Sequence, residues 1–134
     1  MDEREFQRRT KQLALDVIAL VEAPTPGRAV DVIGRQVLRS ATSVGANYRA
    51  SCRARSIQEI IAKLSIVEEE SDETIYWLEL LIDGGFAPGD RVRAIITEGR
   101  EILAMTVASK KRLKSRINAR SFAEGTSAGS GAEL

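Results

Sequence analysis

The stretch RSATSVGANYRA, from Arg39 to Ala50, decides the fold of this chain, because at helical pitch it divides into three stripes of different chemistry. An apolar stripe faces a core. A polar stripe lies about 90° to one side of it, and an arginine stripe lies roughly opposite. The stripes are, in that order, Ile33, Val37, Ala41, Val44 and Tyr48; Gln36, Ser40, Ser43 and Asn47; and Arg35, Arg39, Thr42, Ala46, Arg49 and Arg53.

The polar stripe predicts a helix-packing motif. Small hydroxyl and amide side chains beside a core let a neighbouring helix come close, and they can hydrogen-bond across the contact. A ligand or substrate site is the alternative interpretation, but the sequence offers no base to activate Ser40 or Ser43. The predicted motif consists of Gln36, Ser40, Ser43 and Asn47.

The arginine stripe allows two interpretations. Arginines on an outward helix face usually lie in water or pair with acids, and the third predicted helix carries an acidic stripe of Glu68, Asp72, Glu79 and Asp83. Arginine forks also suit phosphate groups, which would make the stripe a nucleic-acid contact. The candidate nucleic-acid contacts on this helix are Arg35, Arg39, Arg49 and Arg53.

Outward from this stretch, the chain divides into four amphipathic segments. The sequence S-x-x-E at Ser56 predicts a capping box at the start of the third segment, and Gly84 with Gly85 predicts its end. Because short connections place consecutive helices antiparallel, we expect an all-α, up-down-up-down four-helix bundle over residues 1–118. The predicted helices cover about 3–22, 29–53, 56–83 and 89–118, and a disordered Gly/Ser/Ala-rich tail is expected at 119–134.

Composition limits the classes of function. The 134 residues are 43% hydrophobic and 4% aromatic, which suits one small domain with an aliphatic core. There is no histidine, so Ser-His and Cys-His couples and histidine metal sites are excluded. The net charge of +1 points to no particular partner. We therefore expect no catalytic residue, no cofactor, no metal and no small-molecule substrate.

The number of cysteines and the hydropathy of the chain indicate where in the cell the protein is found. The single cysteine, Cys52, cannot form an internal disulfide and favours a reducing compartment. The N-terminal sequence MDEREFQRRTK lacks the apolar run of a signal peptide. No segment approaches the roughly 18 consecutive apolar residues of a membrane span. These features predict a soluble cytoplasmic protein.

The third predicted helix is apolar on two sides. Ile60, Leu64 and Val67 begin its core stripe, while a second apolar set points elsewhere and contains the only tryptophan. A monomeric bundle helix needs one apolar face, so the second set predicts a homo-oligomer interface. A wide core or scattered surface residues are the alternative. The predicted interface residues are Ile66, Trp77, Leu80 and Leu81.

The last predicted helix ends in the basic sequence KKRLKSR. Cations here can simply oppose the helix macrodipole, or, repeated around an oligomer, they can concentrate a field that binds RNA or DNA. No aromatic residue interleaves with them, so base stacking is not expected. The candidate nucleic-acid contacts are Lys110, Lys111, Arg112, Lys114 and Arg116.

The segment from Gln36 to Leu81 resembles the bacterial four-helix-bundle family associated with intervening sequences of 23S ribosomal RNA. The family pattern is roughly Q-x-x-R-[SA]-A-x-S-[VI]-x-x-N, followed by R-x-S-x-x-[EF]-[FI] and a helix with a Ser/Gly and acid cluster. Many members continue with Asn-Ile-Ala-Glu-Gly, where this chain has Asn47 to Ser51 without the acid or the glycine. The matching residues are Gln36, Arg39, Ser40, Ala41, Ser43, Val44, Asn47, Arg55, Ser56, Glu59, Ile60, Leu64, Ile66, Glu70, Ser71 and Glu73.

This resemblance implies a ring-shaped homopentamer of antiparallel four-helix subunits without established enzymatic activity. A related accessory protein of diversity-generating retroelements binds nucleic acid and a reverse transcriptase through a basic pentameric ring. We therefore expect a non-catalytic homo-oligomeric scaffold or adaptor, with a pentamer favoured. The alternative is a ring that binds RNA or DNA and assists a ribosomal RNA or reverse-transcriptase system.

Overall fold

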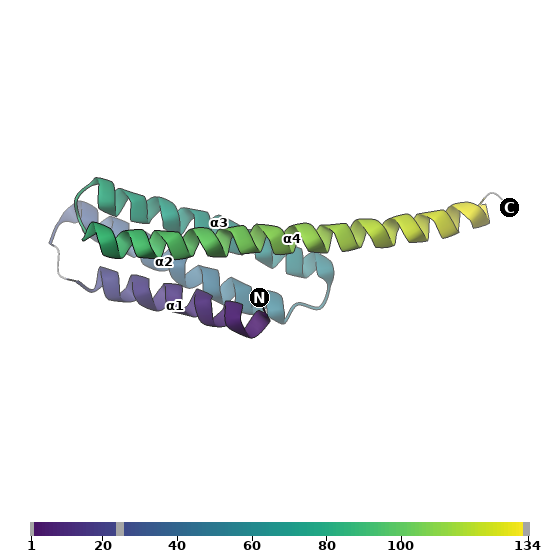
Figure 1. Cartoon of the computed structure of the whole chain (residues 1–134), viewed down its shortest axis with the longest axis horizontal. Coiled ribbons are helices and arrows are strands. Elements are labelled where there is room, and N and C mark those ends of the chain that lie inside the picture. The colour runs from purple at the N-terminus through teal and green to yellow at the C-terminus, as the bar shows by residue number, and fades with distance from the viewer. Residues whose placement is uncertain (1, 24–25, 133–134) are drawn as a thin grey trace.

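The computed structural model describes residues 2–23 and 26–132, with side chains described as far as Ala123. This part of the chain contains helices and no strands (Figure 1). The helices are α1 (Glu3–Val21), α2 (Arg28–Cys52), α3 (Ile57–Asp83) and α4 (Gly89–Ala132). The fold is therefore all-α, as the apolar periodicity predicted.

The four helices pack side by side around one core (Figure 1). Each helix contacts the next one along the chain, and α1 also contacts α4. Over the described residues, α1 has no packing contact with α3, so these two helices lie diagonally across the bundle. The three connections lie at alternate ends of the helices (Figure 1). Each helix thus keeps one face on the core and one face outward.

The helix ends follow from local sequence. The side chain of Asp2 caps α1 by accepting a hydrogen bond of 2.7 Å from the amide of Glu5. Ser56 caps α3 by accepting a 3.1 Å bond from the amide of Glu59, whose carboxylate in turn accepts from the amide of Arg55. Ser56 therefore makes the expected N-cap bond, while the reciprocal bond of Glu59 goes to the amide just before the N-cap instead of that of Ser56. After α3, Gly85 adopts a φ of +71°, a conformation that glycine reaches without strain.

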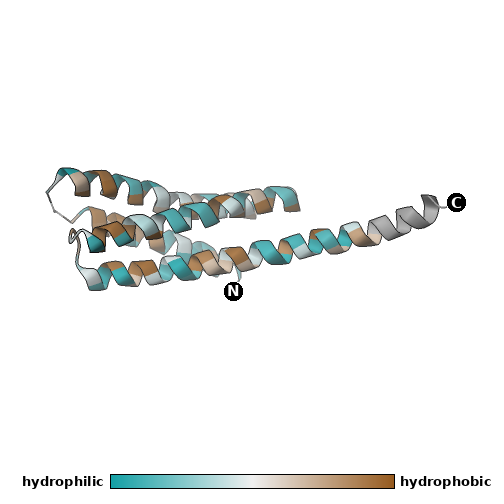
Figure 2. Ribbon diagram, turned by 90° about the horizontal axis from the view of Figure 1, so that it is seen from above, coloured by the Kyte–Doolittle hydropathy of each residue, from teal (hydrophilic) through white to brown (hydrophobic). Residues whose placement is uncertain are grey.

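The core is aliphatic, with one aromatic pair. Leu13, Val37, Leu78 and Ile102, one from each helix, are completely buried. Burial of such a side chain contributes roughly 1.5–3 kcal/mol, so the apolar stripes account for the stability of the packed helices. Figure 2 shows apolar and polar residues recurring along each helix, as an amphipathic bundle requires. At one end of the core, the rings of Phe6 and Tyr48 lie 4.3 Å apart and join α1 to α2.

The structure differs from the sequence prediction at the end of α4. We expected helix to about 118 and disorder from 119, but α4 continues to Ala132 and projects beyond the other helices (Figure 1). The described side chains at 118–123 are all exposed. Without a proline to end it, an established helix gains one hydrogen bond for each residue added. Residues 133–134 of the predicted tail lie outside the described residues.

Within the described residues, no helix is both long enough and apolar enough to cross a membrane.

Candidate functional site

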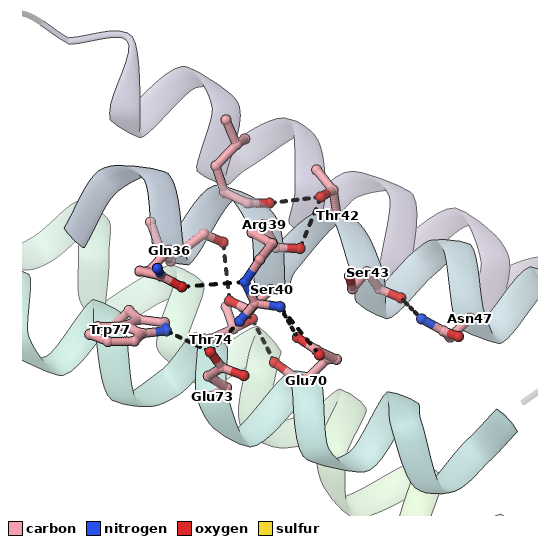
Figure 3. Close-up of polar contacts among 12 residues, drawn as sticks. Gln36, Arg39, Ser40, Thr42, Ser43, Asn47, Glu70, Glu73, Thr74 and Trp77 are labelled. Carbon is pink, nitrogen blue, oxygen red and sulfur yellow. Dashed lines mark hydrogen bonds and ion pairs between the residues drawn. The ribbon is translucent and has the colours of Figure 1, made fainter. Parts of the chain in front are cut away.

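The contact between α2 and α3 is built on two small hydroxyl residues. Ser40 and Thr74 are fully buried, and the Thr74 hydroxyl lies 2.9 Å from that of Ser40 (Figure 3). The Ser40 hydroxyl lies 3.2 Å from the Val37 carbonyl oxygen, to which it donates. Thr74 Oγ1 also lies 2.7 Å from the carbonyl oxygen of Glu70, so its single proton serves one acceptor at a time. These bonds satisfy polar groups that would be costly to bury alone.

The other members of the polar stripe bond within α2. The side-chain amide of Asn47 donates to the backbone carbonyl oxygen of Ser43 at 2.9 Å. The side-chain oxygen of Gln36 accepts from the guanidinium of Arg39 at 3.3 Å (Figure 3). Gln36, Ser43 and Asn47 are half-buried. Among the described residues, Ser40 alone of the four predicted motif residues makes a direct hydrogen bond to α3. The stripe therefore packs along α3, but only one member bonds across the contact.

Arg39 closes the outer edge of this contact. Its guanidinium lies 3.2 Å from the carboxylate of Glu70 and is also hydrogen-bonded to Glu73, which accepts a 3.1 Å bond from the indole of Trp77 (Figure 3). Partial burial raises the pKa of Glu73, but the bonds from Arg39 and Trp77 outweigh it, so this pKa lies below its ordinary value. The bond to Glu73 in turn raises the pKa of Arg39. We name Arg39, Glu70, Glu73 and Trp77 the arginine clamp.

The partners of Arg39 differ from those that the acidic stripe predicted. Glu68 lies 3.5 Å from Lys110 and Glu79 lies 3.5 Å from Arg100, so both acids face α4 instead of α2. The cause is the rotation of α3 in the bundle, which directs Glu70 and Glu73 to α2.

Several predicted nucleic-acid contacts are engaged within the chain. Arg39 lies in the clamp, Arg35 pairs with Asp31 at 3.0 Å, and the side chain of Lys110 is only 13% exposed. Packing of α3 on α4 places the ammonium of Lys110 3.5 Å from the carboxylate of Glu68. Arg112 donates to the Ser109 hydroxyl. No described acid lies within ion-pair distance of the remaining predicted contacts, which are exposed: Arg49, Arg53, Lys111, Lys114 and Arg116.

A basic groove of about 650 Å³ lies between α1 and α2. Thr10 approaches Gly45 closely here: a Cβ at residue 45 would lie 3.5 Å from the carbonyl oxygen of Thr10. Small residues such as Ala14 and Ala46 line the groove between these helices. Its cations are Arg4, Arg8, Lys11, Arg49 and Arg53, and Glu3 is the acid in its lining.

The cations that α1 contributes to this groove were not among the predicted contacts. Arg4, Arg8 and Lys11 recur at spacings of four and three, which places them on one face of a helix. That signal was present in the sequence, but the partnership of this face with Arg49 and Arg53 depends on how α1 and α2 are rotated. Of these cations, Arg8 is paired with Glu5.

The predicted oligomer interface is partly exposed and partly core. Ile66, Trp77 and Leu80 are half-buried, whereas Leu81 is 3% exposed and belongs to the core. Leu81 lies in the core because its position three residues after Leu78 brings it onto the same inward face.

Tyr76 is an exposed residue of α3 that our prediction omitted. It is 54% exposed, and its ring stands nearly edge-on to Trp77 with centroids 5.1 Å apart. The outer surface of α3 therefore presents aromatic and aliphatic side chains beside the arginine clamp.

Among the described residues, the side chains that could react with or bind a ligand do not form a cluster. Cys52 is half-buried beside the α1/α2 groove, and burial raises the pKa of nearby Tyr48. The cysteine and the acids in the described part of the chain form no group of three or more suited to a metal ion.

We expect acid to open the arginine clamp at a pH below 4.5, the ordinary pKa of a glutamate. Because the folded pKa of Glu73 is lowered, its paired carboxylate stabilises the fold at neutral pH, and this contribution is lost as pH falls through the folded pKa. The fluorescence of Trp77, the only tryptophan, should report this step. Arg39→Gln should move the midpoint to higher pH, and the control Arg35→Gln should leave it in place. Equal midpoints in Arg39→Gln and the unsubstituted protein would contradict the clamp.

Comparisons with known proteins agree with this architecture. Residues 3–108 match the family described as 23S rRNA-intervening sequence protein. The chain is similar to the crystal structure of a protein of unknown function from the S23 ribosomal protein family of Bacteroides thetaiotaomicron, with a TM-score of 0.76 and 31% identity over 83% of this chain and 99% of that one. A search of curated proteins found no match. Because the family match spans most of the chain, this protein belongs to the 23S rRNA-intervening sequence protein family.

Proposed function

We propose that the protein is a non-catalytic scaffold or adaptor whose up-down-up-down bundle is the subunit of a homo-oligomer. The observation that carries this proposal is the outer surface of α3, where Tyr76 is 54% exposed and Trp77 and Leu80 are half-buried. A helix that already contributes Leu64, Val67 and Leu78 to the core has no need of a second apolar surface. Aromatic side chains that remain in water are typical anchors of protein interfaces.

The arginine clamp supports the same role. Its ion pairs hold Glu73 against Trp77 and so fix the tryptophan beside the exposed Tyr76. A surface whose side chains are held in place loses less conformational entropy on binding. The resemblance to ring-forming relatives favours five subunits, and the lone Cys52 favours a reducing cytoplasm.

We expect the purified protein to have a mass several times that of one chain by light scattering at micromolar concentration. Tyr76→Ser should weaken the assembly by roughly tenfold or more, because truncating an interface anchor costs about 2 kcal/mol. Val107→Ser, which changes an exposed apolar residue of α4, is the matched control and should leave the mass unchanged. A monomeric unsubstituted protein would rule out the scaffold.

Binding of RNA or DNA is the second candidate function, and the basic end of α4 favours it. Lys111, Arg112, Lys114 and Arg116 are exposed on the part of the chain leading into the extension of α4 (Figure 1). In a homo-oligomer each subunit would repeat this cluster, and repeated cations raise the local concentration of a polyanion. Contacts with phosphates would then supply most of the affinity, largely without regard to sequence.

Titration with RNA or DNA across a range of salt concentrations tests this second function. Removing a cation that binds a phosphate should reduce the slope of log K against log salt by about 0.7–0.9, so Lys111→Glu with Lys114→Glu should lower both slope and affinity. Arg91→Glu, on the first turns of α4 at the opposite end, is the control and should bind as the unsubstituted protein does. Absence of binding by the unsubstituted protein at low salt would eliminate the candidate.

A further inference from the structure

Two outward surfaces of the subunit lie on different sides of the bundle. We call them the α1/α2 face and the α3 face; α1 and α3 are diagonal, so the two faces are separate surfaces. The α1/α2 face consists of Leu15, Ile18 and the basic groove, with Arg4, Arg8, Lys11, Arg49 and Arg53. The α3 face consists of Glu69, Asp72, Tyr76 and Leu80.

The exposed residues of each face form an apolar part and a charged part. Leu15 and Ile18 are 48% and 39% exposed, and the groove cations follow toward the start of α1. On α3, the exposed Tyr76 and half-buried Leu80 form the apolar part, and the exposed Glu69 and Asp72 lie toward the start of that helix. No described cation lies within ion-pair distance of Glu69 or Asp72. The two faces therefore carry charges of opposite sign.

Contacts between neighbouring helices show that the apolar parts share one level along the bundle axis. Val21 lies 3.8 Å from the position of a Cβ on Gly34, and Thr10 lies opposite Gly45, so Leu15 and Ile18 are level with the middle of α2. Thr74 bonds to Ser40, which also belongs to the middle of α2. Tyr76 is two residues from Thr74 and thus lies at the level of Leu15 and Ile18.

The charged parts of the two faces also lie at one level along the bundle axis, next to that of the apolar parts. Thr10 lies opposite Gly45, which places Lys11 and Arg8 beside the stretch of α2 from 44 to 47. Since α2 and α3 run antiparallel from the Ser40–Thr74 bond, Asp72 and Glu69 lie beside the stretch from 42 to 45. The acids of one face and the first cations of the other are therefore at the same height on the subunit.

We propose that the α3 face of one copy docks on the α1/α2 face of the next, so that Tyr76 packs on Leu15 and Ile18 while Glu69 and Asp72 meet the groove cations. This proposal rests on the proposed self-association and names the surfaces that carry it. Because each copy uses two different faces, the contact is heterologous and propagates head to tail. A rotation about an axis parallel to the bundle keeps residues at their own height, so it brings the matching levels together, and the contact closes into a ring where that rotation divides a full turn. The opposite charges fix that register.

Charge reversal with rescue tests the contact. Lys11→Glu with Arg49→Glu places acids at the level of Glu69 and Asp72, and Glu69→Lys with Asp72→Lys places cations at the level of Lys11 and Arg49. All four residues are exposed, so the fold should persist by circular dichroism. Each double variant should raise the dissociation constant of assembly by about a hundredfold or more, since like charges across an interface are strongly unfavourable. The quadruple variant exchanges the charges and should regain the mass of the unsubstituted oligomer. Arg28→Glu with Arg91→Glu, at two exposed positions outside both faces, should assemble normally.

Three other results would contradict either the docking contact or self-association itself. An oligomer whose mass is unchanged in both double variants, or a quadruple variant that assembles no better than they do, contradicts this contact but leaves self-association intact. A monomeric unsubstituted protein removes self-association itself. If Lys11→Glu with Arg49→Glu abolishes retention of RNA or DNA without changing the mass, the groove is a phosphate site and the docking proposal is wrong.

Discussion

The close approach of α2 and α3 at Ser40 and Thr74 is the constraint on which the rest of the structure depends. Both side chains are fully buried and their hydroxyls lie 2.9 Å apart, so a rotation or slide of either helix would break the hydrogen bond that joins them and disturb the close packing around it. By contrast, the Ser71 hydroxyl on α3 is buried with no described partner and fixes no register. The register set at Ser40 brings Arg39 within reach of its two glutamates, and the clamp then holds Trp77 at the edge of the contact.

The same register determines which residues remain outward. With α3 rotated so that Thr74 meets α2 and Glu68 meets Lys110 on α4, the side chain of Tyr76 lies exposed. Both proposed activities therefore depend on packing that is internal to the subunit. Self-association uses the surface that the packing exposes, and phosphate binding would use cations that the packing leaves without an acid partner among the described residues, such as Lys111.

Helical periodicity and the S-x-x-E motif were enough to predict four helices, the N-cap at Ser56 and the inward direction of Val37 and Val44. Periodicity predicted the burial and the partners of a side chain less well where these depend on a small rotation of one helix against another. Leu81 lies at the flank of its stripe and turned inward, and Lys110 found an acid on another helix. The Gly/Ser/Ala-rich composition likewise suggested disorder after residue 118. Composition alone does not take into account that a helix already formed extends easily into the residues that follow it.

The free energy of unfolding of two leucine variants tests the central role of Ser40 most directly. Ser40→Leu inserts a larger, apolar side chain where α2 meets α3 and should destabilise the protein by about 1–3 kcal/mol in urea unfolding at fixed protein concentration. Ser43→Leu makes the same change at a half-buried position of α2 without a described bond to α3, and it should cost clearly less. A Ser40→Leu protein as stable as the unsubstituted chain would contradict the claim that this contact sets the register of the bundle.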